Sequence, residues 1–190
     1  MGIKILGGEA KGLGLKAPRD AGIRPMSQGL KRRPFDAAGP LGGVHFVDLC
    51  AGTGAVGLEA YSRGASSVLF YEKNPRHYRL LLENLARFKE NYFHEDRPLR
   101  AVCADCFHWP GWGGECADHL LFFAPPYPKH ELYRRLFKTL ARSPFCGKLW
   151  VESDRQKGLS QADLEEYATA QKVYRQGTGF VCVFDFGDRL

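Results

Sequence analysis

Residues 44–59 read VHFVDLCAGTGAVGLE, and this stretch decides the fold. An apolar run that ends at Asp48 predicts a buried strand, a glycine-rich turn follows it, and a helical pattern begins after the turn. A second apolar run, SVLFY, ends at Glu72, about 20 residues after Gly52. This layout is typical of a small ligand bound across the carboxyl ends of two neighbouring parallel strands.

Two classes of ligand fit the glycine turn. Residues 52–57 match the GxGxxG pattern, and an acidic residue follows at a suitable distance, so a dinucleotide-dependent oxidoreductase stays open as a remote alternative. Asp48 favours a cationic ligand instead, because a carboxylate repels a pyrophosphate. S-adenosylmethionine carries both an ammonium and a sulfonium group. With this ligand, Gly52 and Gly54 let the backbone approach the methionine part, and Glu72 accepts hydrogen bonds from the ribose hydroxyls.

Strands and helices alternate along the rest of the chain. Strands are expected at 44–49, 67–72, 98–103, 119–124 and 147–152, and helices at about 54–64, 75–90 and 129–141. Two more β-rich runs, 171–176 and 179–186, flank Gly177-Thr178, which predicts a tight reversal and an antiparallel last strand. The fold class that follows is α/β, with a doubly wound, mostly parallel seven-stranded sheet and an antiparallel edge strand.

Charge is spread unevenly over the chain. Residues 1–35 hold eight basic and two acidic side chains, whereas residues 36–190 hold 19 of each. We therefore divide the chain into a basic N-terminal arm, 1–35, and a ligand-binding domain, 36–190. A short hairpin is expected on the arm, between Ile3–Leu6 and Gly12–Leu15. A basic arm beside such a domain favours a nucleic-acid partner; the alternative is a solvated, charged extension.

Composition excludes several other classes of protein. The chain has 190 residues, which suits one domain with a sizeable core. No apolar run approaches the roughly 20 residues that cross a bilayer, and the N-terminus lacks the apolar stretch of a signal peptide. The CxxC at Cys103–Cys106 has no second CxxC or His pair beside it, so we expect free thiols and no metal. We expect a cytoplasmic monomer that does not associate with membranes.

Seven stretches of the chain carry a more specific resemblance. They are Ile5-Leu6-Gly7-Gly8-Glu9, Ile23-Arg24-Pro25, the run DLCAGTGAVGLEAYSRG at 48–64, Glu72, Asn84-Leu85, Pro125-Pro126-Tyr127 and Val151-Glu152-Ser153. In these stretches the chain resembles the bacterial 16S ribosomal RNA guanine-N2 methyltransferases nearly from end to end. The resemblance implies a Rossmann-like methyltransferase fold and S-adenosylmethionine as cofactor. It also implies small-subunit ribosomal RNA, or a ribosomal particle, as partner, with methyl transfer to the exocyclic N2 amine of a guanine.

The resemblance also implies roles for individual residues. The cofactor would be held by Asp48, Ala51, Gly52, Gly54, Glu72 and Asp105. Asp105 would accept a hydrogen bond from the adenine amino group, although an Asx turn is an equal alternative. Tyr127 would stack on an extruded guanine, as enzymes that modify bases require, unless it is a core aromatic. Four basic side chains would contact the RNA backbone: Arg24, Lys31, Arg32 and Arg33.

The catalytic stretch departs from the family pattern at one position. The family motif has Asp or Asn before Pro-Pro-aromatic, whereas this chain reads Ala124-Pro125-Pro126-Tyr127. The Asp or Asn oxygen would accept a hydrogen bond from the guanine amine, and with Ala124 only the Pro125 carbonyl is left. Loss of one such contact lowers a rate by about 10²–10³. A pseudo-methyltransferase that binds cofactor and RNA without methylating is therefore an alternative.

The N-terminal arm also departs from the family pattern. The resemblance implies a helix after Arg24-Pro25, but Gly29 and Pro34 fall within it. A proline inside a helix costs roughly 3 kcal/mol. We therefore expect this helix to be interrupted.

Overall fold

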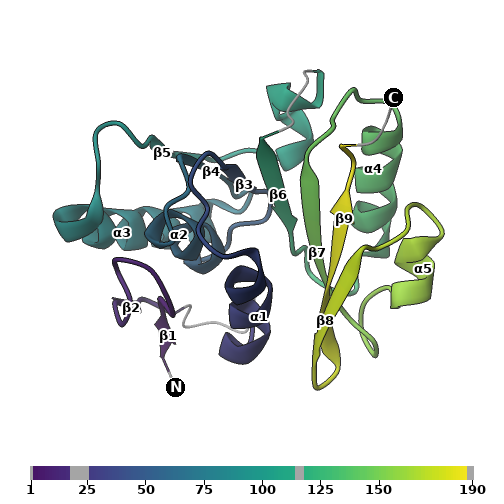
Figure 1. Cartoon of the computed structure of the whole chain (residues 1–190), viewed down its shortest axis with the longest axis horizontal. Coiled ribbons are helices and arrows are strands. Elements are labelled where there is room, and N and C mark those ends of the chain that lie inside the picture. Colours follow the sequence, from purple (N-terminus) through teal and green to yellow (C-terminus); the bar gives the residue numbers. More distant parts are fainter. Residues whose placement is uncertain (1, 18–25, 114–117, 188–190) are drawn as a thin grey trace.

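A seven-stranded sheet forms the centre of the computed structural model, which describes residues 2–17, 26–113 and 118–187 (Figure 1). Its order across the sheet is β5-β4-β3-β6-β7-β9-β8. Strands β3 to β7 are parallel, and β9 runs antiparallel to β7 and β8. The predicted mostly parallel sheet is confirmed, and its antiparallel strand lies one position in from the edge. The strands are β3 (His45–Asp48), β4 (Ser67–Tyr71), β5 (Leu99–Val102), β6 (His119–Phe123), β7 (Lys148–Asp154), β8 (Lys172–Gln176) and β9 (Gly179–Asp185).

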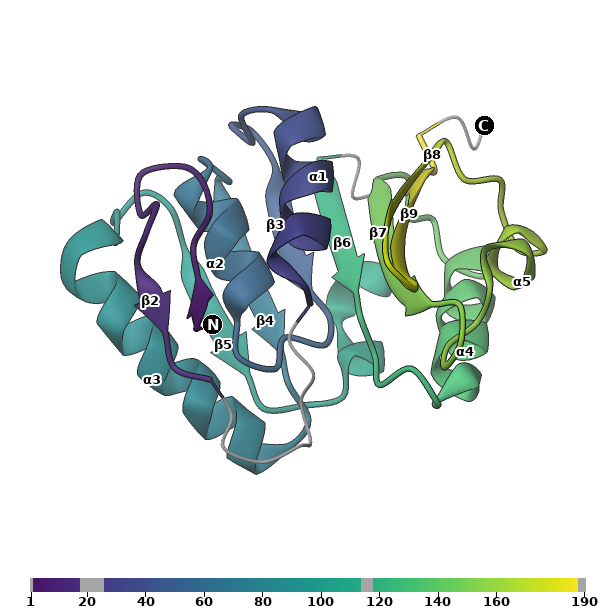
Figure 2. The same cartoon turned by 90° about the horizontal axis from the view of Figure 1, so that it is seen from below.

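Helices cover both faces of this sheet (Figure 2). One face carries α1 (Gln28–Ala38), α2 (Ala55–Ser62) and α3 (Pro75–Tyr92). The other face carries α4 (His130–Ala141), α5 (Gln161–Glu165) and two short 3-10 turns, Cys106–His108 and Pro110–Gly113. Helix α5 and the 3-10 turns were not predicted, because short segments of this kind lack a clear period. No helix in the described ranges has the length and apolar character needed to span a membrane.

The alternation of side chains along the strands sets the two core layers. Phe46, Phe122 and Trp150 face the layer beneath α1–α3, with ring centroids 6.5 Å apart for Phe46 and Phe122 and 6.4 Å for Phe46 and Trp150. Val47 and Val151 face the opposite layer, beneath α4. One residue further on, Asp48 returns to the α1–α3 face at the carboxyl end of β3. The apolar layer therefore ends where the polar crevice begins.

The predicted hairpin is confirmed. β1 (Ile3–Lys4) and β2 (Gly14–Leu15) pair antiparallel, and Figure 2 shows them lying over α2 and α3. Ile5 and Ala10 are fully buried in the core layer that α2 and α3 share. The hairpin is therefore packed into the same hydrophobic core as the domain. The boundary predicted between residues 35 and 36 falls inside α1.

The predicted interruption of the arm helix is wrong, because α1 runs unbroken through Gly29 and Pro34. Ser27 caps its start by accepting a hydrogen bond from the Leu30 amide at 3.3 Å. A Cβ on Gly29 would lie 2.4 Å from the side chain of Gln176, so glycine allows α1 to approach β8 closely. Leu30 and Phe35 are 2% and 0% exposed. Burial of each such side chain contributes about 1.5–3 kcal/mol, which offsets the proline.

Lys31 corrects a second expectation, that this residue contacts RNA. Its side chain is buried, and its Nζ lies 3.1 Å from Glu59 Oε2 and 3.0 Å from the carbonyl oxygen of Lys4, to which it donates. Burial lowers the pKa of Lys31, and Glu59 opposes that shift. Arg63 Nε contacts the other oxygen of Glu59 at 2.8 Å. Lys31 therefore fastens α1 and the hairpin to α2 and is not presented at the surface.

We predict that Lys31→Met lowers the free energy of unfolding by about 3 kcal/mol, because breaking a buried ion pair leaves a charge without its partner. Methionine keeps the apolar stem, and Arg63 still compensates Glu59 in part. The measurement is urea unfolding. The matched control is Arg32→Met, whose partner Asp36 is an exposed neighbour at 2.9 Å, so that the change should be about 1 kcal/mol or less. Equal losses in both variants would contradict the structural role of Lys31.

Candidate functional site

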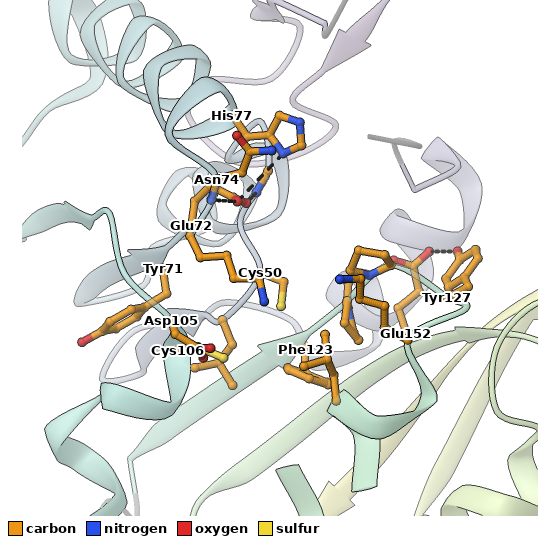
Figure 3. Close-up of a pocket in the computed structure, with 18 of the residues that line it drawn as sticks. Cys50, Tyr71, Glu72, Asn74, His77, Asp105, Cys106, Phe123, Tyr127 and Glu152 are labelled. Atoms are coloured by element: carbon orange, nitrogen blue, oxygen red, sulfur yellow. Dashed lines mark hydrogen bonds and ion pairs between the residues drawn. The ribbon is translucent and has the colours of Figure 1, made fainter. Parts of the chain in front are cut away.

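One cavity of about 650 Å³ opens at the carboxyl ends of the parallel strands. Its walls come from the segments that follow β3, β4, β5 and β6, together with the end of β7 (Figure 3). In that view Glu72, Asn74 and His77 lie on one side, and Tyr127 and Glu152 lie on the opposite side. The crevice predicted from the strand ends therefore exists as a single space that several loops share.

The glycine turn after β3 is held from both sides by carboxylates. Gly52 and Gly54 have φ angles of 53° and 79°, and a Cβ on Gly54 would lie 2.4 Å from a methyl carbon of Leu81. The Gly52 amide donates to Glu72 Oε2 at 2.9 Å. The Gly57 amide, in the first turn of α2, donates to Asp48 Oδ2 at 3.0 Å. The two acids thus fix the turn before any ligand arrives.

Three buried carboxylates lie close enough to interact: Asp48, Glu72 and Glu152, which are 1%, 9% and 5% exposed. Glu72 and Glu152 line opposite walls of the cavity, whereas Asp48 is not among its lining residues and accepts from the Gly57 amide. Burial raises the pKa of Asp48 to about 7, and the charges of Glu72 and Glu152 add to the shift. Like charges in one crevice repel each other, and a ligand with positive charge relieves that repulsion. The crevice therefore suits an ammonium or sulfonium group and disfavours a pyrophosphate, which argues against a dinucleotide.

Glu72 is oriented by backbone donors. Its Oε1 accepts from the Asn74 amide at 2.8 Å, while its Oε2 accepts from Gly52. His77 Nδ1 lies 3.9 Å from the same carboxylate. Each carboxylate oxygen has two lone-pair sites. The carboxylate can therefore accept from ribose hydroxyls as well, the role expected of it.

Asp105 takes part in the Asx turn and also lines the cavity. Its Oδ1 accepts from the Phe107 amide at 3.1 Å, which caps the 3-10 turn Cys106–His108. Its Oδ2 lies 3.7 Å from a nitrogen of Arg135. The two roles weighed for Asp105 are therefore compatible, since the turn holds the side chain at the cavity wall.

The Pro-Pro-Tyr segment forms the opposite wall. Ala124 is half-buried, Pro125 is buried, and Tyr127 is half-buried and borders the cavity. The Tyr127 hydroxyl donates to Glu152 Oε1 at 2.7 Å. Burial, and then the charge of Glu152, raise the pKa of Tyr127 far above its ordinary range, so the hydroxyl stays neutral. Tyr127 is thus a cavity residue and not a core aromatic.

The predicted RNA-binding residues have different positions. Arg32 and Arg33 are exposed on α1, Lys31 is buried, and Arg24 lies outside the described residues. A second basic group was not predicted: it lines the cavity, and its members are Lys73, Arg76, His77, Lys129 and Lys157. The net charge of residues 36–190 is zero, so composition gave no indication of this group. Its position in the sequence could have indicated it, since most of its members follow the ends of β4 and β6.

Two cysteines also line the cavity and were not predicted. Cys50 follows β3, and Cys106 begins the first 3-10 turn. The hydrogen bond with the Cys106 thiol, together with burial, raises the pKa of Cys50 well above its ordinary value, so Cys50 remains a thiol. Among the described residues no group of three or more His, Cys, Asp or Glu could hold a metal ion.

The chain is similar to known proteins in sequence and in fold. The family model described as Conserved hypothetical protein 95 matches residues 3–184. The Escherichia coli ribosomal RNA small subunit methyltransferase D is 34% identical over 161 residues, which cover 83% of this chain and 77% of that protein. The solved structure of Escherichia coli yhhF has a TM-score of 0.75 at 22% identity and covers 98% of both chains.

A more distant structure contains a ligand. The RNA methyltransferase of Salinibacter ruber was solved in complex with S-adenosyl-L-homocysteine. It has a TM-score of 0.58 at 11% identity and covers 88% of this chain and 96% of that chain. This likeness concerns the fold.

We predict that the affinity for S-adenosylmethionine rises with pH up to about 7 and then levels off. A cation bound nearby would favour the ionised form of Asp48, whose pKa of about 7 makes its carboxyl largely protonated in the empty protein at about pH 5.5. Calorimetry in two buffers with different ionisation enthalpies should show proton release at about pH 6. In the empty protein the same shift makes stability fall as the pH rises from 3.8, the ordinary value, to about 7, because only the folded chain keeps the proton.

The matched control is Asp48→Asn, whose amide oxygen can still accept from Gly57. Its affinity should be weaker and nearly independent of pH between about 5.5 and 7. An equal pH dependence in both proteins would show that the ionisation of Asp48 is not coupled to binding of the cationic ligand.

Proposed function

The chain belongs to the family described as Conserved hypothetical protein 95, and we propose that it methylates the exocyclic N2 amine of a guanine in small-subunit ribosomal RNA. Its cofactor is S-adenosylmethionine, which supplies an electrophilic methyl group on a sulfonium. The name of the Escherichia coli relative supports the ribosomal substrate. The name does not specify the methylated atom, and the choice of guanine N2 rests on the chemistry of the Pro-Pro-Tyr wall.

One observation carries the proposal: a carboxylate-lined site for a cation and the Pro-Pro-Tyr wall face the same cavity. Asp48 and the glycine turn would hold the methionine part, and Glu72 the ribose. Ala51 is buried within that turn, where its backbone amide donates to the Tyr71 carbonyl at 2.9 Å. Asp105 would face the adenine. In this arrangement the cavity would bring a methyl donor and a flat base within reach of each other.

The substrate wall suits an exocyclic amine. The lone pair of the guanine N2 is delocalised into the ring, so the amine reacts only when hydrogen-bond acceptors hold it in line with the methyl group. The Pro125 carbonyl can be one acceptor. The ring of Tyr127, neutral and fixed through its hydroxyl, offers a surface on which an extruded base can stack.

RNA would approach over the basic side chains at the mouth of the cavity. Lys73, Arg76, Lys129 and Lys157 are exposed and lie on both sides of the opening. Such charges neutralise phosphates and position the strand, while the base itself is recognised inside the cavity. Arg32 and Arg33, which are exposed on α1, belong to the same proposal, as does Arg24 from sequence alone.

Ala124 is the observation that favours a second candidate function, a pseudo-methyltransferase that binds cofactor and RNA without turnover. The direct test is transfer of a tritiated methyl group to unmodified small-subunit particles, followed by nucleoside analysis by mass spectrometry. The proposal expects label in N2-methylguanosine. Label in another nucleoside would reject guanine N2, and cofactor and particle binding without label would favour the second candidate.

We predict that Ala124→Asn raises the single-turnover rate of methyl transfer by about tenfold or more. A side-chain oxygen at the end of β6 would accept one of the two amine hydrogens along a shorter path than an acceptor on a neighbouring strand, and one preorganised contact of this kind accounts for about 10²–10³ in rate. Cofactor affinity should stay unchanged, because Glu72 and the glycine turn are untouched. The size-matched control is Ala124→Leu, which adds no acceptor. A rate gain with leucine, or none with asparagine, would mean that position 124 acts only through packing.

We predict that the double variant Lys129→Gln, Lys157→Gln weakens RNA binding and flattens its salt dependence. Each phosphate contact that is lost should reduce the slope of log affinity against log salt by about 0.9 for a duplex and about 0.7 for a single strand. Arg32→Gln with Arg33→Gln tests α1 in the same way. The control pair is Arg142 and Lys148, exposed bases at the amino end of the sheet. If the control changes the slope as much, the basic group at the cavity has no special role.

A further inference from the structure

Glu152 and Ala124 occupy neighbouring positions on adjacent strands. β6 and β7 are parallel, and their register pairs Phe122 with Trp150 and Phe123 with Val151. One step further along both strands come Ala124 and Glu152. Adjacent strands are about 4.8 Å apart. The backbone of Glu152 is therefore about one strand spacing from the residue that precedes the Pro-Pro-Tyr wall.

The two side chains also share a face of the sheet. Trp150 belongs to the core layer beneath α1–α3, and Val151 belongs to the opposite layer. Successive strand residues alternate between faces, so Glu152 returns to the α1–α3 face, where Ala124 also packs. The methyl group of Ala124 is short, whereas the side chain of Glu152 is long. The carboxylate of Glu152 can therefore reach farther from the sheet than the methyl group of Ala124.

Glu152 lines the cavity and is held there. It is 5% exposed, and its Oε1 accepts from the Tyr127 hydroxyl at 2.7 Å. Figure 3 shows this pair on one wall, across the cavity from Glu72. A carboxylate has about four lone-pair sites, so it can accept from Tyr127 and from a ligand at the same time.

Glu152 brings an acceptor to the wall that also carries Pro125, and both residues line the cavity. A glutamine at this position could accept the same hydrogen bond from Tyr127 with its one oxygen, but its other polar group is a donor, whereas both oxygens of a carboxylate accept. The adjacent Pro125 carbonyl is also an acceptor. Together they suit a group with two N–H donors.

We propose that Glu152 is a catalytic residue that accepts a hydrogen bond from the exocyclic amine of the substrate guanine, the contact that Ala124 cannot make. This inference rests on the proposed function. The amine has two hydrogens, one for the Pro125 carbonyl and one for Glu152, so that its lone pair is directed out of the base plane. N2 gives that pair to the methyl carbon, the sulfur keeps the pair of the bond that breaks, and the proton that N2 then loses passes to Glu152 and on to water.

The competing role for Glu152 is that it only positions the ring of Tyr127. A double-mutant cycle separates the two roles. Single-turnover transfer to small-subunit particles is measured for wild type, Glu152→Ala, Tyr127→Phe and the double variant. The proposal expects Glu152→Ala to lower the rate about 10²-fold in both backgrounds, with partial recovery in Glu152→Gln, which keeps an acceptor oxygen. If Glu152→Ala has no effect in the Tyr127→Phe background, the proposal is overturned.

A binding experiment tests the same contact without turnover. Guanosine and inosine differ by the 2-amino group, so they report on any acceptor for N2. With S-adenosylhomocysteine at saturation, NMR titration of the wild type should show guanosine binding about tenfold more tightly than inosine. Glu152→Ala should lose much of this preference and should bind inosine as the wild type does. Unchanged S-adenosylhomocysteine affinity confirms that the variant is folded.

The two experiments distinguish failure of this inference from failure of the proposed function. A wild type that prefers guanosine through Glu152 but transfers no methyl group keeps the inference and rejects the activity. A wild type that methylates N2 of guanine with no dependence on Glu152 keeps the activity and overturns the inference. Equal binding of guanosine and inosine by the wild type also overturns it.

Discussion

Electrostatic repulsion among buried carboxylates is the constraint on which the site depends. Asp48 at the end of β3 lies close enough to Glu72 and Glu152 for both charges to raise its pKa. Such repulsion between buried like charges costs stability. Backbone amides of Gly52, Asn74 and Gly57 lower part of the cost by donating to Glu72 and Asp48. Protonation of Asp48, whose pKa is about 7, relieves part of the remainder in the empty site, and a bound cation would relieve it with Asp48 ionised.

The same carboxylates connect the site to the fold. Asp48 joins β3 to the first turn of α2, and Glu72 joins the end of β4 to the glycine turn. At its far end α2 is joined to the arm, through Glu59 and its buried partner Lys31. Helix α1 and the hairpin are thus fastened to the element whose first turn faces the ligand. This explains why α1 and the hairpin are packed as part of the core.

Much of the fold could be predicted from the sequence, because each core strand is a short apolar run that ends in a polar residue or a turn. The glycine turn, Asp48 and Glu72 could be placed for the same reason: their roles follow from position along one strand. What was missed depends on neighbours across the sheet. Glu152 lies beside Ala124 through the register of β6 and β7, and Lys31 reaches Glu59 through packing of α1 on α2. Tertiary burial of Phe35 likewise decided that Pro34 remains inside a helix.

Position 124 shows why a sequence motif should be interpreted together with the neighbouring strands of its sheet. A missing side-chain acceptor at the end of β6 can be supplied from β7, because adjacent parallel strands present residues of equal register to the same face. An aspartate at the end of β6 would reach the crevice along a short path, whereas a glutamate on β7 reaches it from one strand away and needs its orientation fixed. The Tyr127 hydroxyl gives that orientation at 2.7 Å. Tyrosine and glutamate therefore form one unit, in which the ring that can receive a base also aims the carboxylate beside it.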